Sequence, residues 1–119
     1  MAAENQRTIS DWAAKTFGNS NPEVSIRRML KECKELEDKL EMGVFSHEQL
    51  ADEIADVFIC GYRAMDVLGF DTHACIDHKM EINRHRKWKL NGDGTGQHVQ
   101  KVTKDMKLNM DGSIVYPED

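Results

Sequence analysis

The sequence of 119 residues is poor in proline and in aromatic side chains. It contains two prolines, and aromatic residues make up 7% of the chain, whereas charged residues make up 31%. This composition favours a bundle of helices over a sandwich of aromatic-rich strands. A helical domain of this size buries only about two thirds of the surface of its unfolded chain, so we expect oligomerisation to stabilise it.

The sequence also lacks long apolar runs and a paired set of cysteines. No apolar run approaches the roughly 18 residues of a membrane span, and the N-terminus has no apolar segment typical of a signal peptide. The three cysteines are odd in number and fall within expected helices, which does not suit a disulfide framework. We therefore expect a soluble cytoplasmic protein with reduced thiols.

The sequence also has no excess of positively charged residues. The formal net charge is −5, whereas binding to a nucleic acid backbone needs a clustered Lys and Arg surface. A single nucleotide is not excluded, because a metal ion held by acidic side chains can supply the attractive charge.

Apolar periodicity predicts four helices in a single domain that covers residues 1–119. The expected helices span residues 8–17, residues 22–42, residues 47–68 and residues from Asp71 or Thr72 to about Trp88 or Leu90. The first three helices are expected to start at a cap. These caps are Thr8 or Ser10 for the first helix, Asn21 followed by Pro22 for the second, and the capping box of Ser46 and Gln49 for the third. Gly18, Gly43 and Gly69 are expected to end these helices.

The third helix is apolar nearly all round. Its main apolar stripe comprises Leu50, Ile54, Val57, Phe58, Gly61, Met65 and Leu68. Ala55, Ile59 and Tyr62 lie on the opposite side, and in so short a chain we expect this second side to pack against another subunit.

The C-terminal part has a different composition. The run NGDGTGQ after the fourth helix cannot hold a helix, because three of its residues are glycines. The remaining tail could form a short hairpin across the residues MDG or a clasp on a neighbouring subunit. The expected fold is therefore an all-α bundle of about four helices with a short irregular or β-hairpin tail, assembled as an oligomer.

Two pairs of acidic residues point to a metal site. Glu32 and Glu35 lie beside the apolar stripe of the second helix, and Glu53 and Asp56 repeat that spacing on the third. Like charges brought together inside a bundle repel unless they are compensated, and hard divalent cations such as Mg²⁺ are the usual compensation. The alternative is that the first pair is solvated charge, balanced by Arg28 and Lys39 on the same face.

A polar line is expected on the fourth helix. Lys79, Asn83 and Arg86 are spaced by four and three residues, so they share one face and could hold a phosphate tail and a sugar or base edge. The alternative is an ordinary basic face.

Two aromatic residues of the first helix have two interpretations. Trp12 and Phe17 are most simply core residues, and we expect that role. The alternative is that both rings stack on a nucleotide base, which keeps Trp12 among the candidate substrate-binding residues. Zinc and di-iron sites are not supported, since the cysteines and histidines form no two-ligand knuckle and no Glu is followed three residues later by His.

The acidic spacing also resembles a known family. The pattern Glu32-x-x-Glu35 followed by Glu53-x-x-Asp56 resembles the metal-binding signature of the MazG-like all-α nucleoside triphosphate pyrophosphohydrolases, and the line from Lys79 resembles their nucleotide-contacting segment. The segments WAAKTFG, KMEINRHRKW and GDGTGQHV together resemble the mostly phage-associated dATP/dGTP pyrophosphohydrolase subgroup. The resemblance covers most of residues 8–99.

The resemblance implies a function, a cofactor and an assembly. It implies Mg²⁺ or Mn²⁺ at the four carboxylates and hydrolysis of dGTP or dATP to the monophosphate and pyrophosphate. It also implies a homodimer or homotetramer, located in the host cytoplasm if a phage encodes the chain. Lys79 and Arg86 would steady the pyrophosphate, and Asn83 would contact sugar or base. Many relatives carry a further Glu where this chain has Lys31.

Two other functions remain open at this point. The same fold could act on another nucleotide, such as a pyrimidine or a modified base, because base selection depends on pocket shape. A non-catalytic helical adaptor that uses the apolar third helix for assembly is the alternative from another class. A titration with metal ions would distinguish this adaptor from the enzyme, because the adaptor has no reason to bind them.

Overall fold

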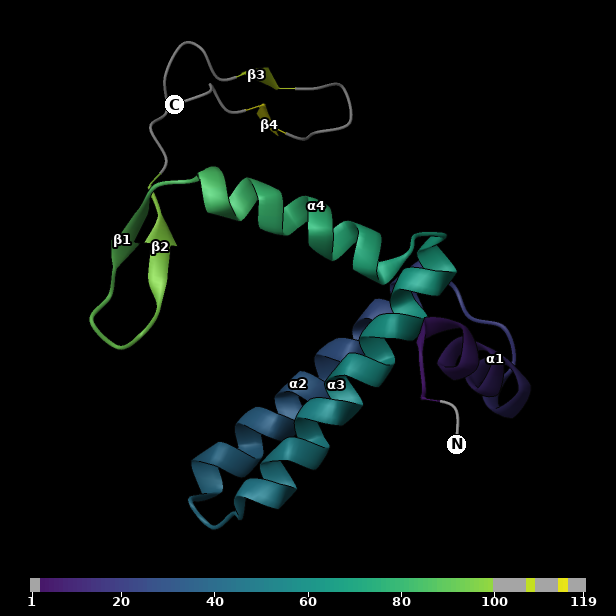
Figure 1. Ribbon diagram of the computed structural model, residues 1–119. Coiled ribbons are helices and arrows are strands. Elements are labelled where there is room, and N and C mark those ends of the chain that lie inside the picture. Colours follow the sequence, from purple (N-terminus) through teal and green to yellow (C-terminus); the bar gives the residue numbers. More distant parts are fainter. Residues whose placement is uncertain (1–2, 100–106, 109–113, 116–119) are drawn as a thin grey trace. The chain divides into compact units, whose positions relative to one another are not determined.

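Four helices dominate the residues that the computed structural model describes, which are 3–99, 107–108 and 114–115. They are α1 (Gln6–Phe17), α2 (Pro22–Met42), α3 (His47–Leu68) and α4 (Thr72–His85) (Figure 1). Two antiparallel hairpins follow, in which β1 (Trp88–Leu90) pairs with β2 (Gly96–His98) and β3 (Lys107–Leu108) pairs with β4 (Ile114–Val115). The predicted helical fold with a β-hairpin tail is confirmed. The residues MDG, expected at the turn of the last hairpin, lie outside the described residues.

The starts of α2 and α3 are those that the capping residues predict. The side-chain oxygen of Asn21 accepts the backbone N–H of Val24 at 2.9 Å, and Pro22 is the first helical residue. Ser46 and Gln49 form the expected capping box, with reciprocal hydrogen bonds of 3.1 and 2.9 Å. These bonds satisfy N–H groups that have no partner within the helix.

The start of α1 differs from the prediction. The helix begins at Gln6 and is capped by Asn5, not by Thr8 or Ser10. Thr8 instead completes a capping box, because its backbone N–H donates to the Asn5 side chain at 3.0 Å and its hydroxyl accepts from the Asn5 backbone at 2.9 Å. Asn caps a helix as well as Ser does, so the earlier position takes the role.

The end of α4 also differs from the prediction. The helix stops at His85, before the predicted end at Trp88 or Leu90, because residues 88–90 pair with residues 96–98 across the glycine-rich loop. Gly92 and Gly94 both have a φ of 90°, which suits that loop since glycine adopts positive φ without strain. The indole N–H of Trp88 then donates to the carbonyl of Asn83 at 2.9 Å.

The chain divides into two compact units, Met1–Ile76 and Asp77–Asp119. In the first unit α2 and α3 run antiparallel side by side, and α1 packs against α3 (Figure 1). Its buried apolar residues are Ile9 and Ala13 of α1 and Ala64 of α3. The second unit contains most of α4 and the two hairpins. No helix in the described ranges is long and apolar enough to cross a membrane.

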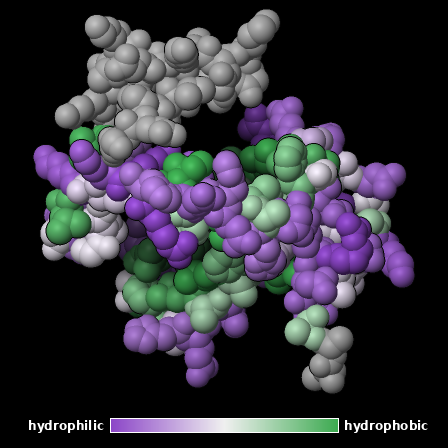
Figure 2. Space-filling model, turned by 45° about the horizontal axis from the view of Figure 1, so that its top comes forward, coloured by the Kyte–Doolittle hydropathy of each residue, from purple (hydrophilic) through white to green (hydrophobic). Residues whose placement is uncertain are grey.

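The covered face of α3 is narrower than the predicted stripe. Gly61 lies against α2, since a Cβ at this position would be 3.5 Å from the Met29 sulfur, and Ala64 is buried. Ile54 and Phe58 were expected in the same stripe, yet they are 43% and 65% exposed. One neighbouring helix on each side covers only part of an α-helix, so the rest of the apolar surface of α3 stays open in a single chain. Figure 2 shows hydrophobic surface exposed among the hydrophilic side chains.

Candidate metal centre and adjoining pocket

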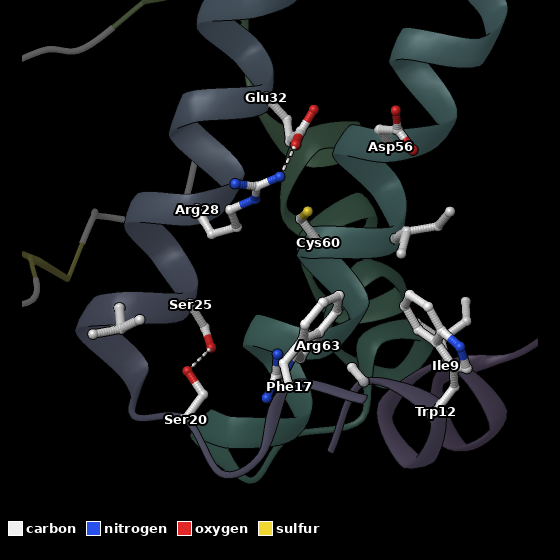
Figure 3. Close-up of a pocket in the computed structure, with 13 residues that line it drawn as sticks. Ile9, Trp12, Phe17, Ser20, Ser25, Arg28, Glu32, Asp56, Cys60 and Arg63 are labelled. Atoms are coloured by element: carbon white, nitrogen blue, oxygen red, sulfur yellow. Dashed lines mark hydrogen bonds and ion pairs between the residues drawn. The ribbon is translucent and has the colours of Figure 1, made fainter. Parts of the chain in front are cut away.

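Three of the four predicted carboxylates meet between α2 and α3. One carboxylate oxygen from each of Glu32, Glu35 and Glu53 lies within 4.8 Å of the other two, and we refer to these residues as the carboxylate cluster. Glu32 is only 5% exposed. Asp56 is outside this group of three but lines the adjoining pocket together with Glu32 (Figure 3). The sequence spacing and the antiparallel packing of α2 on α3 thus bring the two acidic pairs to one place.

Two cations balance part of this negative charge. The guanidinium of Arg28 donates to Glu32 Oε1 at 2.8 Å, one turn earlier on α2. The ammonium of Lys39 donates to Glu53 Oε1 at 3.0 Å. The alternative from the sequence placed both cations beside Glu32 and Glu35, but Lys39 reaches across to α3. The ion pair that the alternative predicts between Arg28 and Glu32 is thus present, but Glu32 is buried while Glu35 is exposed.

The pKa of Glu32 is raised above its ordinary value of 4.5. Burial is the largest cause, followed by a hydrogen bond with Glu35 and by the negative charge of that residue. Arg28 opposes the rise, and Asp56 adds to it. The charged form of Glu32 is thus less favourable than it would be in water, and a bound cation would relieve that cost.

A pocket of about 490 Å³ adjoins the cluster within the first unit. Glu32 and Asp56 lie at one end of it, and Trp12 and Phe17 lie at the other (Figure 3). The pocket thus joins acidic groups to an aromatic wall. The residues that line it are Ile9, Trp12, Ala13, Phe17, Ser20, Val24, Ser25, Arg28, Glu32, Asp56, Ile59, Cys60 and Arg63.

Trp12 and Phe17 are not core residues, contrary to the expectation that we favoured. They are 53% and 66% exposed, and their rings form an edge-to-face pair with centroids 5.4 Å apart. The reason is that α1 packs through Ile9 and Ala13, which are buried one turn apart. The aromatic pair therefore belongs to the pocket wall.

Several pocket residues were missed by the sequence analysis. Ser25 is buried, and its hydroxyl lies 2.7 Å from that of Ser20. Arg63 was not considered. A signal for both existed, because Ser25 precedes Glu32 by seven residues and Arg63 follows Asp56 by seven, and two helical turns return a side chain to the same face.

The polar line of α4 is shorter than predicted. Lys79 and Asn83 lie on the helix, but Arg86 follows its end and its backbone N–H donates to the carbonyl of Asn83 at 3.3 Å. Helical spacing therefore does not place Arg86 on a shared face with the other two. Lys79 is exposed, and Asn83 is half-buried.

Comparison with known proteins gives two matches of consequence. No protein-family model matches the sequence. The chain is 34% identical over 97 residues to a dATP/dGTP diphosphohydrolase of Salmonella phage PMBT28, across 82% of this chain but only 31% of that relative. The chain thus spans about a third of the length of this curated relative.

A solved structure matches the fold over most of its own length. It is the MazG-like pyrophosphohydrolase of cyanophage S-2L, bound to dGDP and three catalytic Mn²⁺ ions per active site. The TM-score is 0.62 at 26% identity, and the match covers 81% of this chain and 90% of that one. The chain therefore has the MazG-like helical fold. Its resemblance to the dATP/dGTP pyrophosphohydrolases, inferred from the sequence, is confirmed by both matches.

Proposed function

We propose that this protein is a metal-dependent pyrophosphohydrolase that converts dGTP or dATP to the monophosphate and pyrophosphate. The observation that carries the proposal is the carboxylate cluster at one end of a pocket whose other end is aromatic. Such a pocket suits a molecule with a polyphosphate at one end and a flat base at the other. The two phage proteins to which the chain is similar support the same chemistry, one by its name and the other by its bound dGDP and Mn²⁺.

The donor set fits Mg²⁺ or Mn²⁺. All of its ligand atoms are carboxylate oxygens, which hard divalent cations prefer. The three oxygens lie within 4.8 Å of one another, so one cation could contact all three. Glu32, Glu35 and Glu53, with Asp56 beside them, would hold the ions. When bound, such ions neutralise phosphate charge and lower the pKa of a coordinated water.

The pocket residues would orient the nucleotide. Arg28 fixes the Glu32 carboxylate through its 2.8 Å bond and brings positive charge to the pocket end at which phosphates would lie. Trp12 offers a half-exposed ring on which a base can stack. The roles proposed for α4 are those expected from the sequence, with Lys79 and Arg86 binding the leaving pyrophosphate and Asn83 contacting the sugar or base.

Product analysis tests this proposal. With Mn²⁺ or Mg²⁺, purified protein should release dGMP and pyrophosphate from dGTP, and should cleave dGTP or dATP faster than dCTP or dTTP. Glu53→Gln and Asp56→Asn should abolish turnover while the helical circular dichroism signal stays unchanged. Release of dGDP and orthophosphate, or a clear preference for pyrimidine substrates, would refute the assignment.

We also propose that the protein acts as a homodimer or homotetramer. The support is the exposed apolar surface of α3, where Phe58 is 65% and Ile54 is 43% exposed. Ile59, predicted to face another subunit, lines the pocket and is 38% exposed. Substitution of Ile59 would therefore disturb substrate binding as well as assembly, which makes Phe58 the cleaner site for a test.

A further inference from the structure

Arg63 of α3 forms a hydrogen bond with the C-terminal end of α1. Arg63 Nη2 donates to the backbone carbonyl of Gly18 at 2.6 Å, although the two residues are 45 positions apart in sequence. Gly18 caps α1, and the last carbonyls of a helix have no partner within it. A guanidinium at this point satisfies such a carbonyl and interacts favourably with the negative end of the helix dipole.

The same guanidinium contacts the aromatic wall of the pocket. Its Cζ lies 5.8 Å from the centroid of the Phe17 ring, within the range of a cation–π interaction. Phe17 in turn meets Trp12 at nearly a right angle, with an interplanar angle of 86°. Arg63, Phe17 and Trp12 therefore form a continuous row of contacts along the pocket (Figure 3).

Apolar packing at this end of α1 is weak. Ile9 and Ala13 are buried against the rest of the unit, whereas all of residues 14–17 are exposed. The last turn of α1 carries Phe17 and has little buried apolar surface to fix its direction. The hydrogen bond and ring contact of Arg63 supply that restraint.

We propose that Arg63 is a positioning residue that holds Trp12 and Phe17 in the geometry in which a nucleotide base stacks on them. This inference rests on the proposed function, since it assigns the aromatic end of the pocket to the base. Arg63 acts through the aromatic pair and not on the phosphate groups. Its loss should therefore weaken binding of the whole nucleotide without slowing the chemical step.

The experiment compares two substitutions of Arg63 with a matched control. Arg63→Met keeps an unbranched apolar side chain similar to the aliphatic stem of arginine but removes both contacts, and Arg63→Lys keeps the charge but loses the planar guanidinium. Arg27→Met is the control, because Arg27 is an exposed arginine of α2 whose partner is Glu23 at 3.1 Å. Circular dichroism establishes that each variant is folded.

Fluorescence of Trp12 reads its position without any nucleotide. Measured in a Trp88→Phe background, Arg63→Met should shift the emission of Trp12 and increase its quenching by acrylamide. The control should leave both unchanged. If Arg63→Met does not fold, Arg63→Lys serves for the same comparison, with a smaller change in the same direction.

Enzyme kinetics, measured in protein that retains Trp88, then distinguish a positioning role of Arg63 from phosphate binding. We expect Arg63→Met to raise KM for dGTP roughly tenfold, with kcat within about twofold and inhibition by pyrophosphate unchanged. Unchanged KM and Trp12 fluorescence would overturn the inference, as would a fall in kcat with weaker pyrophosphate inhibition. If the wild-type protein hydrolyses no nucleotide, the proposed function fails, whereas the fluorescence comparison still decides whether Arg63 holds Trp12.

Discussion

Replacing the buried carboxylate Glu32 by glutamine should change stability in opposite directions with and without metal. Two like charges 4.8 Å apart repel by about 3.5 kcal/mol at an effective dielectric constant of about 20, and by about 0.9 kcal/mol at the value of water. Glu35 is exposed, so the lower figure applies to it. The charge of Glu53 is already offset by Lys39 at 3.0 Å. Relief of repulsion is therefore worth about 1 kcal/mol, and removal of a charge from a buried position, the largest cause of the raised pKa of Glu32, adds to it.

The lost ion pair opposes this gain. Arg28 is more than half exposed, and exposed pairs contribute about 0–1 kcal/mol, while glutamine can still accept a hydrogen bond from the guanidinium. The net effect should be a stabilisation of roughly 1 kcal/mol, which raises the Tm of the metal-free protein by about 3–6 °C. Glu37→Gln is the control, because Glu37 is an exposed residue of the same helix paired with Lys34.

Addition of Mn²⁺ should reverse the order. An ion that binds only the folded state stabilises it by about 2.7 kcal/mol at a concentration of 100 times Kd. The wild-type protein should show this rise in Tm, and Glu32→Gln should lose most of it. Differential scanning calorimetry with and without Mn²⁺ measures both effects. A Glu32→Gln variant that melts several degrees below wild type without metal, or that gains as much as wild type from Mn²⁺, would refute the reasoning.

The same substitution should alter the pH dependence of stability. Burial and the neighbouring Glu35 raise the pKa of Glu32 in the folded protein above its ordinary value of 4.5, so the folded state holds this proton more tightly than the unfolded chain does. The stability from this group is fully present below pH 4.5 and is lost as the pH rises through the folded-state pKa. The difference in Tm between wild type and Glu32→Gln, both without metal, should therefore be largest at neutral pH and shrink toward pH 4.5.

Local signals in the sequence were sufficient for most helix ends and for the acidic cluster. Ser46 and Asn21 cap α3 and α2 as predicted, because a cap depends only on residues within the next turn. The convergence of Glu32 with Glu53 could be predicted because both lie beside apolar stripes that must face each other in a bundle. Their role as metal ligands stays a prediction.

Features that depend on the crossing of helices could not be predicted. Helical spacing places Lys39 beside Glu35. The hydrogen bond from Lys39 to Glu53 forms because this part of α2 lies next to α3. The exposure of Trp12 depends likewise on which side of α1 packs on α3. The early end of α4 reflects a competition between helix and hairpin for residues 88–90, which neither pattern decides alone.

Three further substitutions test assembly, substrate contacts and the balance of charge. Phe58→Glu should dissociate the oligomer, whereas a wild-type protein of 13.6 kDa by light scattering would contradict assembly. Asn83→Ala should mainly raise KM and Lys79→Ala should mainly lower kcat, and the reverse pattern would exclude the roles proposed for these residues. Lys39→Met should strengthen Mn²⁺ binding, because the Lys39 ammonium, 3.0 Å from Glu53, competes with the ion for that carboxylate. The expected gain in Mn²⁺ affinity is roughly two- to fivefold, which corresponds to the worth of a partly exposed ion pair. Electron paramagnetic resonance of free Mn²⁺ measures it, and an affinity that falls on removal of Lys39 would mean that the lysine orients Glu53 for the metal and does not compete with it.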